Sequence, residues 1–518
     1  MSNFVNAFNH AANLGRTENG ALSHKTKSLT NPLVAALYTA SQYRDKANAN
    51  REETVNQFQL ALQDDSLREY CLRFALMVRD IEQGMGEREL GRVLFQRLFE
   101  EVALTERQVH TIIDRLVDQK YGRWDDVIYL AEKCKDDFVR KILVSRIVTQ
   151  LVTDVNAKQD QSVSLLGKWM PSINAGKMSR RSAIKWAKVL KLSHAQYRKM
   201  LVELRKRVDI VEARITANQY DQIDYSHVPS LAFIRHMKTF FKHDGIRFND
   251  FLESVNRGES SIHTSTSSVP ELVAQYRQNK ENTSVIDAVN TLWKDWNLQS
   301  YQRNVLPICD VSGSMMTDVG KLECIDVSLG LTIYAAAANK GIFHNKVIAF
   351  SRQSEIISLD DEMTLVDRVQ TLCQHEGYNT NVESVLDNVL AIAKKGNCQR
   401  DEIPTLVFFS DMEFDKAMVD SSSTSIWNTR LLNLLNHDQI TTLFELWRER
   451  YNAAGFDFPK VVFWNINNRS GTVPMIDNDT GLILVSGYNE NLVRMVFDDS
   501  MDPWQALKAL LDNTRYDI

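Results

Sequence analysis

The stretch from Val305 to Met316, "VLPICDVSGSMM", runs a short apolar segment directly into an acid, two serines and a glycine. Further apolar runs of similar length follow it, and helix-like segments such as "IDVSLGLTIYAAAA" and "VESVLDNVLAIAKK" lie between some of them. Short strands that are apolar along their whole length and alternate with helices are typical of a doubly wound parallel α/β sheet. The sequence therefore predicts such a sheet, built from "NVLPICD", "KVIAFS", "TLVFFSD", "KVVFWNI" and "GLILVSG".

The part of the chain before this sheet has a different pattern. From about residue 32 to about residue 253, apolar residues recur at spacings of three and four, which indicates consecutive amphipathic helices. Paired helices without a fixed repeat length predict an α-solenoid-like, helical-repeat region. We therefore expect a helical-repeat region over residues 1–255 and an α/β domain over residues 285–518, joined by a Ser- and Thr-rich linker over residues 256–284.

Composition bounds the class of protein. A chain of 518 residues is too long for a single core, and 44% hydrophobic and 25% charged residues argue against general disorder. The six cysteines include no C-x-x-C pair, which is typical of a reducing compartment. The sequence shows neither a secretory leader nor an apolar run long enough to span a bilayer, so we expect a cytoplasmic protein with no membrane partner.

The opening stretch places oxygen-bearing side chains at the carboxyl end of its predicted strand. Asp310, Ser312 and Ser314 form a D-x-S-x-S pattern, and an extended turn can direct these alternate side chains to one point. Hard divalent cations bind oxygen ligands, and ligands of doubly wound sheets bind beyond the carboxyl ends of the strands. The same residues also fit an ordinary turn followed by a helix N-cap, so this pattern alone leaves both interpretations open.

Two later strand ends favour the metal interpretation. Thr380 precedes the predicted helix in "GYNTNVESVLD", and Asp411 ends the apolar strand "TLVFFSD". Together with Asp310, Ser312 and Ser314, they resemble the metal-ion-dependent adhesion site (MIDAS) of von Willebrand factor A domains at all five positions. The resemblance implies Mg2+ or another divalent cation, bound directly by the serines and the threonine and largely through water by the aspartates. It also implies one open position for a carboxylate of a protein partner.

Further motifs extend the resemblance over nearly the whole chain. They resemble an uncharacterised family that joins a helical region to a von Willebrand factor A domain: "TENGA" (17–21), "RDIEQGMGERE" (79–89), "YGRWDDVI" (121–128), "LLGKWMPS" (165–172), "LRKRVDIVEARI" (204–215), "IDYSHVPSLA" (223–232), "KHDGIRF" (242–248), "FFSDMEFD" (408–415), "VVFWNIN" (461–467) and "LVSGYNENL" (484–492). That family is similar in architecture to the Ro autoantigen, or TROVE, proteins, which bind small noncoding RNAs on a ring of helical repeats closed by an A domain.

A strongly basic segment gives independent support for an RNA partner. Residues 168–207 contain twelve lysines and arginines against a single glutamate, although the whole chain has a net charge of -5. Such segregation suits a phosphate backbone. The aromatic residues within it fit buried helix faces, and the charges could also form a solvated surface that pairs with acidic parts of the chain. The residues we expect to contact RNA are Lys177, Arg180, Arg181, Lys185 and Lys188.

No sequence motif indicates catalysis. "GMGER" at residues 84–88 lacks the strand-loop-helix setting of a phosphate-binding loop, and we expect a helix boundary with a structural polar cluster of Arg79, Asp80, Glu87 and Arg88. The chain contains neither H-E-x-x-H nor G-x-S-x-G, and alternation along the strand turns Cys309 toward the sheet interior.

Three functions are compatible with these patterns. The first is a non-enzymatic binding protein whose helical region binds structured or small noncoding RNA and whose A domain binds an Asp or Glu of a protein partner through Mg2+. The second is a structural or assembly protein that uses both halves for protein contacts. The third is an A-domain adaptor of an AAA+ ATPase.

Overall fold

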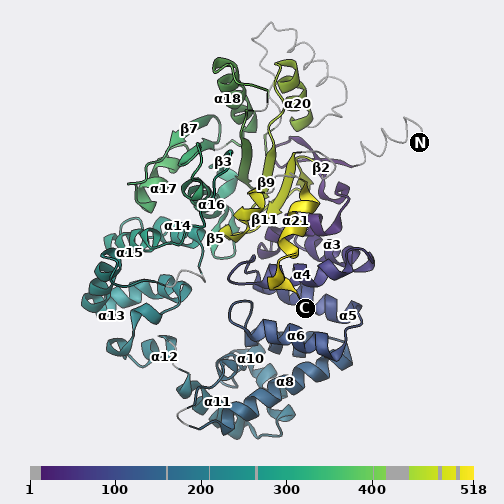
Figure 1. The fold of residues 1–518 in the computed structure, drawn as a ribbon. Helices are drawn as coiled ribbons and strands as arrows, with labels where there is room; N and C mark the ends of the chain where they lie inside the picture. Colours follow the sequence, from purple (N-terminus) through teal and green to yellow (C-terminus); the bar gives the residue numbers. More distant parts are fainter. Residues whose placement is uncertain are drawn as a thin grey trace.

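The computed structural model describes residues 13–158, 161–208, 211–262, 267–377, 379–400, 402–415, 443–476, 481–497 and 502–517. Within them a six-stranded sheet has the order β11-β9-β8-β3-β6-β7 (Figure 1). Its strands are β3 (Val305–Asp310), β6 (Lys346–Phe350), β7 (Ser354–Ser358), β8 (Thr405–Ser410), β9 (Val461–Asn465) and β11 (Leu482–Ser486). The predicted strands are confirmed and pair in parallel. Strand β7 is an antiparallel edge strand that apolar runs could not reveal, because it is only half apolar.

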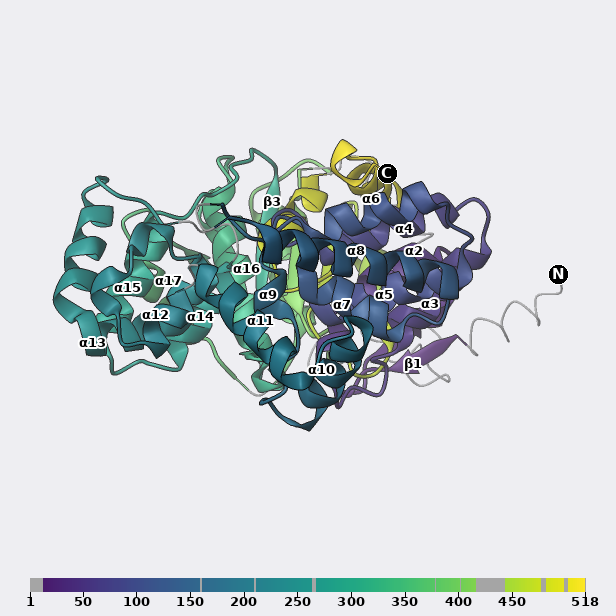
Figure 2. The ribbon, with the colours of Figure 1, turned by 90° about the horizontal axis from the view of Figure 1, so that it is seen from below.

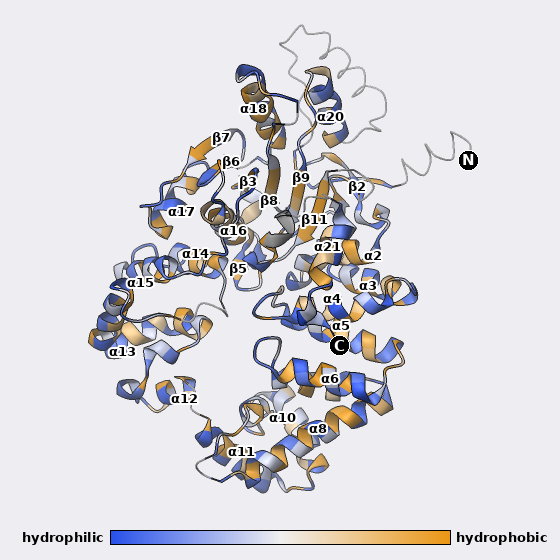
Figure 3. Cartoon of the chain, in the orientation of Figure 1, coloured by the Kyte–Doolittle hydropathy of each residue, from blue (hydrophilic) through white to orange (hydrophobic). Residues whose placement is uncertain are grey.

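Helices cover both faces of this sheet. On one face, α16 (Cys324–Ala338) packs against β3 and β8, where Ser328 contacts Cys309. On the other, α20 (Leu443–Ala453) places Phe444 against Phe408 and Phe463. The remaining helices of the domain are α17 (Leu365–Cys373), α18 (Val382–Lys395) and α21 (Pro503–Leu511). The parallel strands are hydrophobic along most of their length, as two-sided burial requires (Figure 3).

The predicted N-terminal helical region is confirmed. Its helices are α2 (Pro32–Thr39), α3 (Glu53–Gln63), α4 (Arg68–Arg79), α5 (Arg88–Glu101), α6 (Glu106–Val117), α7 (Trp124–Lys133), α8 (Asp137–Asn156), α9 (Leu166–Trp169), α10 (Lys177–Val189), α11 (His194–Arg207), α12 (Val211–Thr216) and α13 (Ser230–Asn256). They lead away from the sheet to α10 and α11 and then return toward it (Figures 1 and 2). Among the described helices, none is long and apolar enough to cross a membrane.

The range 256–284, expected to be a linker, contains a buried helix. This helix, α14 (Val269–Arg277), begins with a capping box between Ser268 and Glu271 and packs along α16. The approach is close because α16 carries Gly330, at which a Cβ atom would lie 2.6 Å from the backbone nitrogen of Pro270. Helix α15 (Thr283–Lys294) follows and packs on α13, α14 and α17. The buried helix α16 is therefore enclosed by α14 on the side away from the sheet.

The first described residues also belong to the α/β domain in space. Strand β2 (Leu22–Lys25) pairs with β1 (Leu14–Arg16) and with β10 (Thr472–Val473). Helix α2 packs on β9 and β11. The beginning of the chain thus runs beside the carboxyl ends of the sheet strands, where the predicted site lies.

Candidate functional site

The predicted metal ligands lie in three loops at the carboxyl edge of the sheet. Asp310 is the last residue of β3, and Asp411 directly follows the neighbouring strand β8. Ser312 donates its backbone N–H to Oδ1 of Asp310 at 3.0 Å, and its hydroxyl lies 3.1 Å from that of Ser314. A hydroxyl of Ser410 donates to the other carboxylate oxygen of Asp310. The register of two parallel strands therefore brings four of the five predicted ligands together.

The third loop carries Thr380 and is tied to the second. The backbone N–H of Thr380 donates to Oδ2 of Asp415 at 3.0 Å, and its carbonyl accepts from the Asp415 N–H at 3.0 Å. Helix α18 then begins two residues later, with Asn381 as its N-cap. All five predicted ligands are thus placed by neighbouring loops of one sheet edge.

The side chains of this cluster are buried, which shapes their electrostatics. Asp310, Ser312, Thr380 and Asp411 are fully inaccessible to solvent. Burial raises the pKa of Asp310 to about 6. Burial, and next the neighbouring charge of Asp310, raise the pKa of Asp411 to about 6. Two carboxylates that are removed from water and repel each other gain from a nearby positive charge.

The donor set fits a hard divalent cation. It consists of two carboxylates and three hydroxyls, and Mg2+ prefers oxygen ligands of this kind. In the described part of the chain, no group of three or more His, Cys, Asp or Glu residues could hold a metal, so the hydroxyls are essential to the fit. Ser312 lies at the start of a short 3₁₀ helix but its side chain makes no capping hydrogen bond there. The helix cap of the alternative interpretation therefore does not describe its contacts, whereas the turn is present, because the Asp310 carboxylate accepts the Ser312 N–H.

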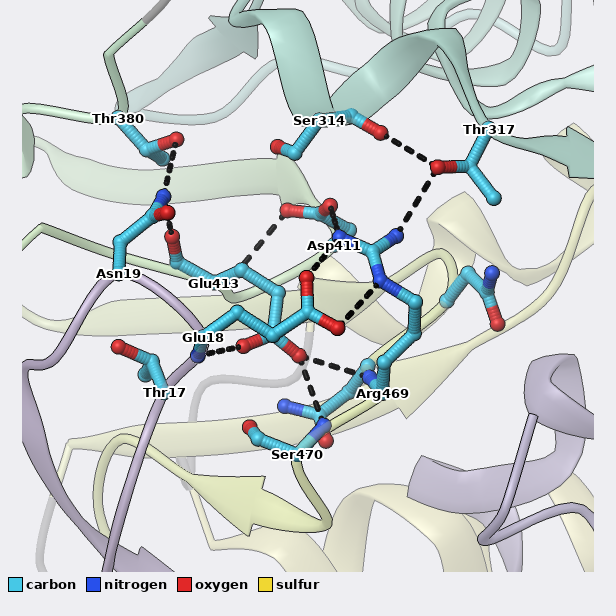
Figure 4. A network of polar contacts seen from close by, with 12 residues as sticks. Thr17, Glu18, Asn19, Ser314, Thr317, Thr380, Asp411, Glu413, Arg469 and Ser470 are labelled. Atoms are coloured by element: carbon cyan, nitrogen blue, oxygen red, sulfur yellow. Dashed lines mark hydrogen bonds and ion pairs between the residues drawn. The ribbon is translucent and has the colours of Figure 1, made fainter.

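An arginine that we did not predict neutralises part of this cluster. The Nη2 atom of Arg469 lies 3.1 Å from Oδ2 of Asp411 and 2.8 Å from Oε2 of Glu18 (Figure 4). Its Nε atom donates to Oε1 of Glu18 at 2.9 Å, and its Nη1 atom donates to Thr317 at 3.2 Å. Arg469 follows β9, whereas Glu18 lies in the "TENGA" motif between β1 and β2. One guanidinium therefore joins the loop at Glu18 and the segment after β9 to the candidate metal site.

A second unpredicted residue, Glu413, holds the same two loops. One oxygen of its buried carboxylate accepts the backbone N–H of Glu18 at 2.7 Å. The other accepts the N–H groups of Arg469 at 2.7 Å and Ser470 at 2.9 Å. The Asn19 side chain donates to the Glu413 carbonyl at 2.6 Å and to the Thr380 hydroxyl at 3.2 Å. The loop at residues 17–19 thus contacts one candidate ligand directly and another through Arg469 (Figure 4).

The predicted RNA-contacting residues share the outer face of α10. Lys177, Arg181 and Lys188 recur at helical spacing, and the opposite side of the helix carries the buried Trp186, whose indole N–H donates to Glu132 at 2.7 Å. Tyr197 of α11 is buried as well, as predicted for these aromatic residues. Within the described residues, five exposed cations of α10 make no side-chain hydrogen bond or ion pair: Lys177, Arg180, Arg181, Lys185 and Lys188.

Other cations of the basic segment have structural roles. The Arg205 guanidinium donates to the carbonyls of Gly167 and Met170 and to Ser172. The Arg207 guanidinium donates to three further carbonyls, those of Asp154, Lys158 and Gln161. Within the basic segment, Arg205 and Arg207 therefore hold backbone carbonyls, whereas the five cations of α10 remain available to a partner.

The motifs set aside in the sequence also have defined environments. Helix α4 ends at Arg79 and α5 begins at Arg88, so "GMGER" is a helix boundary as predicted. Three of the polar residues expected to cluster around it make structural ion pairs with other segments: Arg79 with Asp126, Asp80 with Arg515, and Glu87 with Arg44. Cys309 is buried in the sheet, and burial raises the pKa of its thiol to about 12. These contacts stabilise the fold and leave Cys309 protonated at neutral pH.

The fold and site define a class of protein in which a helical region is continuous with a mostly parallel α/β domain that carries an oxygen-rich cluster at its carboxyl edge. Residues 175–302 match a family model described as "Domain of unknown function (DUF2828)", and residues 304–510 match one described as "Domain of unknown function (DUF7788)". The chain is therefore similar to both of these uncharacterised domain families, which match adjoining parts of it.

Two similar proteins span most of the chain. The "Uncharacterized protein L728" of Acanthamoeba polyphaga mimivirus is 25% identical over 543 residues, which cover 97% of this chain and 88% of that protein. The crystal structure of the Deinococcus radiodurans RO (RSR) protein is similar with a TM-score of 0.43 and 12% sequence identity, over 88% of this chain and 92% of that chain.

Proposed function

We propose that this protein is a non-enzymatic binding protein with two separate binding surfaces. Its α/β domain holds Mg2+ at the carboxyl edge of the sheet and, through the metal, a carboxylate of a protein partner. Its helical region contacts the phosphate backbone of a small or structured noncoding RNA through α10. The observation that carries the proposal is the convergence of two buried carboxylates and three hydroxyls from separate loops.

The metal half of the proposal rests on donor chemistry and burial. Ser312, Ser314 and Thr380 would hold the ion through their hydroxyls, with Asp310 and Asp411 acting through water. When bound, the metal supplies a positive charge with an open position for an anionic ligand. Asp310 is itself oriented by the Ser410 hydroxyl and by the Ser312 N–H, so the protein fixes its position before any ligand arrives.

The RNA half rests on the free cations of α10. Cations that already hold carbonyls or carboxylates contribute little to a new partner, whereas unpaired surface cations can each take a phosphate and release its counterions. The buried hydrogen bond of Trp186 to Glu132 fixes α10 without using these charges. The five unpaired cations of α10 therefore form the phosphate-binding surface that we propose, and we call them the α10 basic face.

Crosslinking in the native host followed by sequencing of bound RNA tests this function. We expect the wild-type protein to recover a defined set of RNAs, and the triple variant R180E/R181E/K185E to lose them. A matched control, K280E/K395E/K460E, changes the charge equally at exposed lysines outside the α10 basic face. Equal RNA recovery by both variants would contradict the assigned surface, whereas a stoichiometric protein complex without RNA would favour an assembly role.

A further inference from the structure

The loop Thr17–Asn19 and Arg469 contact side chains of the candidate metal site that a bound ion would use. Arg469 gives its positive charge to Asp411, and Asn19 donates to the hydroxyl of Thr380. Asp411 and Thr380 are two of the five predicted ligands. Each of them thus already accepts a hydrogen bond from another part of the same chain.

The charge arrangement resembles that of an occupied site. A buried carboxylate pair needs a positive charge, and the guanidinium of Arg469 provides one at 3.1 Å from Asp411. The carboxylate of Glu18 then neutralises the far side of the guanidinium through two hydrogen bonds of 2.8 and 2.9 Å. A cation and an acid placed in this order over Asp411 correspond to a metal ion followed by the carboxylate of a partner.

The loop is anchored to the segment that follows Asp411 along the chain. The N–H of Glu18 is held by the Glu413 carboxylate, and the Thr17 hydroxyl donates to the carbonyl of Phe414 at 2.6 Å. These contacts join residues 17–18 to residues 413–414, which lie two and three positions after Asp411 along the chain. A shift of the Asp411 loop would therefore also move the loop Thr17–Asn19.

We infer that the loop Thr17–Asn19 and Arg469 form an internal occupant of the candidate metal site, which a divalent cation displaces before a partner's carboxylate can bind. A second positive charge next to Asp411 repels the guanidinium. A metal ion bound directly by the Thr380 hydroxyl oxygen also competes with the Asn19 amide for the lone pairs of that oxygen. Cation binding and loop docking therefore oppose each other. The inference rests on the proposed metal-binding function.

Hydrogen–deuterium exchange of the full chain, followed by mass spectrometry, measures loop docking. The peptide covering residues 14–22 contains the N–H of Glu18, which the Glu413 side chain protects in the docked state. We expect saturating Mg2+ to raise deuterium uptake in this peptide in the wild-type protein and not in Asp310→Ala. Uptake that is unchanged, or lowered, while calorimetry shows Mg2+ binding would overturn the internal occupant and leave the proposed metal site standing.

Variants of the occupant test the same inference from the other side. Arg469→Gln removes the competing cation, so we expect its affinity for Mg2+ to be at least tenfold higher than that of the wild type. The control Arg400→Gln breaks an exposed ion pair with Asp457 and should leave the affinity unchanged.

Should Arg469→Gln fold poorly, Glu18→Gln keeps the shape of a partly exposed side chain and should raise exchange in the 14–22 peptide without Mg2+. Equal or weaker Mg2+ binding by Arg469→Gln would contradict the inference. Absence of Mg2+ binding in the wild type and in Arg469→Gln would remove the proposed function and, with it, the occupant.

Discussion

The guanidinium of Arg469 lies 3.1 Å from the buried carboxylate of Asp411, across 58 positions of sequence. This pair connects the carboxyl ends of β8 and β9, which are adjacent strands of the sheet. The arginine also reaches Glu18, so the beginning of the chain closes over the same edge. The candidate site is therefore a junction of distant segments as well as a set of strand-end oxygens.

The pH dependence of this junction follows from the two raised carboxyl pKa values. Burial raises the pKa of Asp310 and of Asp411 to about 6, whereas aspartate side chains in the unfolded chain have a pKa of about 4. The native state therefore holds protons on these groups more tightly than the unfolded chain does. Without metal, the stability contributed by the protonated pair is present below about pH 4 and is lost as the pH rises through 6. The two groups repel each other, so the titration belongs to the pair.

Thermal unfolding in the presence and absence of Mg2+ checks this prediction. Mg2+ binds the charged carboxylates, so we expect the rise in Tm caused by saturating Mg2+ to be larger at pH 7.5 than at pH 5. Asp310→Ala should show no Mg2+-dependent rise at either pH. A shift in Tm that is as large at pH 5 as at pH 7.5 would contradict the assignment of these carboxylates to the site.

The α10 basic face makes a separate prediction about salt. Each phosphate contact contributes roughly 0.7 to 0.9 to the slope of log affinity against log salt concentration. Replacing Arg180, Arg181 and Lys185 by glutamate should therefore reduce the slope by about 2 to 3 and weaken binding at low salt. Fluorescence anisotropy with a labelled RNA recovered from the host measures both quantities. The control K280E/K395E/K460E should keep the wild-type slope, and a slope that is equal in both triple variants would contradict phosphate contact by α10.

The buried ion pair between Arg79 and Asp126 predicts a strong effect on stability. Asp126 accepts hydrogen bonds from Arg79 at 2.9 Å and from Arg92 at 2.6 Å. Burial acts to raise the pKa of Asp126, but the two arginines outweigh it, and the net pKa lies below its usual value. Asp126→Asn leaves the buried guanidinium of Arg79 without its counter-charge, which typically costs about 3 to 5 kcal/mol.

Chemical denaturation followed by far-UV circular dichroism measures this loss as a lower midpoint. Asp457→Asn is the matched control, because Asp457 pairs with Arg400 where both side chains are mostly exposed. We expect the control to change stability by less than about 1 kcal/mol. Similar midpoints for the two variants would show that the Arg79–Asp126 pair does not stabilise the helical region.

The sequence could reveal those parts of the fold that depend on short, local segments. Each parallel strand is a continuous apolar run because both of its faces are covered, and each predicted metal ligand follows such a run or precedes a helix. The position of Asp310 beside Asp411 then follows from the pairing of β3 with β8. The basic face of α10 is likewise local, since its cations recur at helical spacing.

Contacts between distant segments could not be predicted in this way. Glu18 and Arg469 are 451 positions apart, and nothing in either local pattern indicates the other. The range 256–284 is rich in Ser and Thr, yet α14 within it is buried because Gly330 allows a close approach to α16. The "TENGA" motif was visible as a family resemblance, but only the structure places its glutamate over the candidate metal site.

Isothermal titration calorimetry of the full chain with Mg2+ tests the central claim most directly. We expect the wild-type protein to bind one Mg2+ ion at neutral pH, because the five oxygen donors of the sheet edge fit one hard cation. Asp310→Ala should abolish this binding while circular dichroism shows the fold retained, and Asp457→Ala, at an exposed surface, should bind as the wild type does. A wild-type protein and an Arg469→Gln variant that both show no Mg2+-dependent heat would contradict the metal site, and a folded Asp310→Ala variant that binds Mg2+ with unchanged affinity would contradict its location.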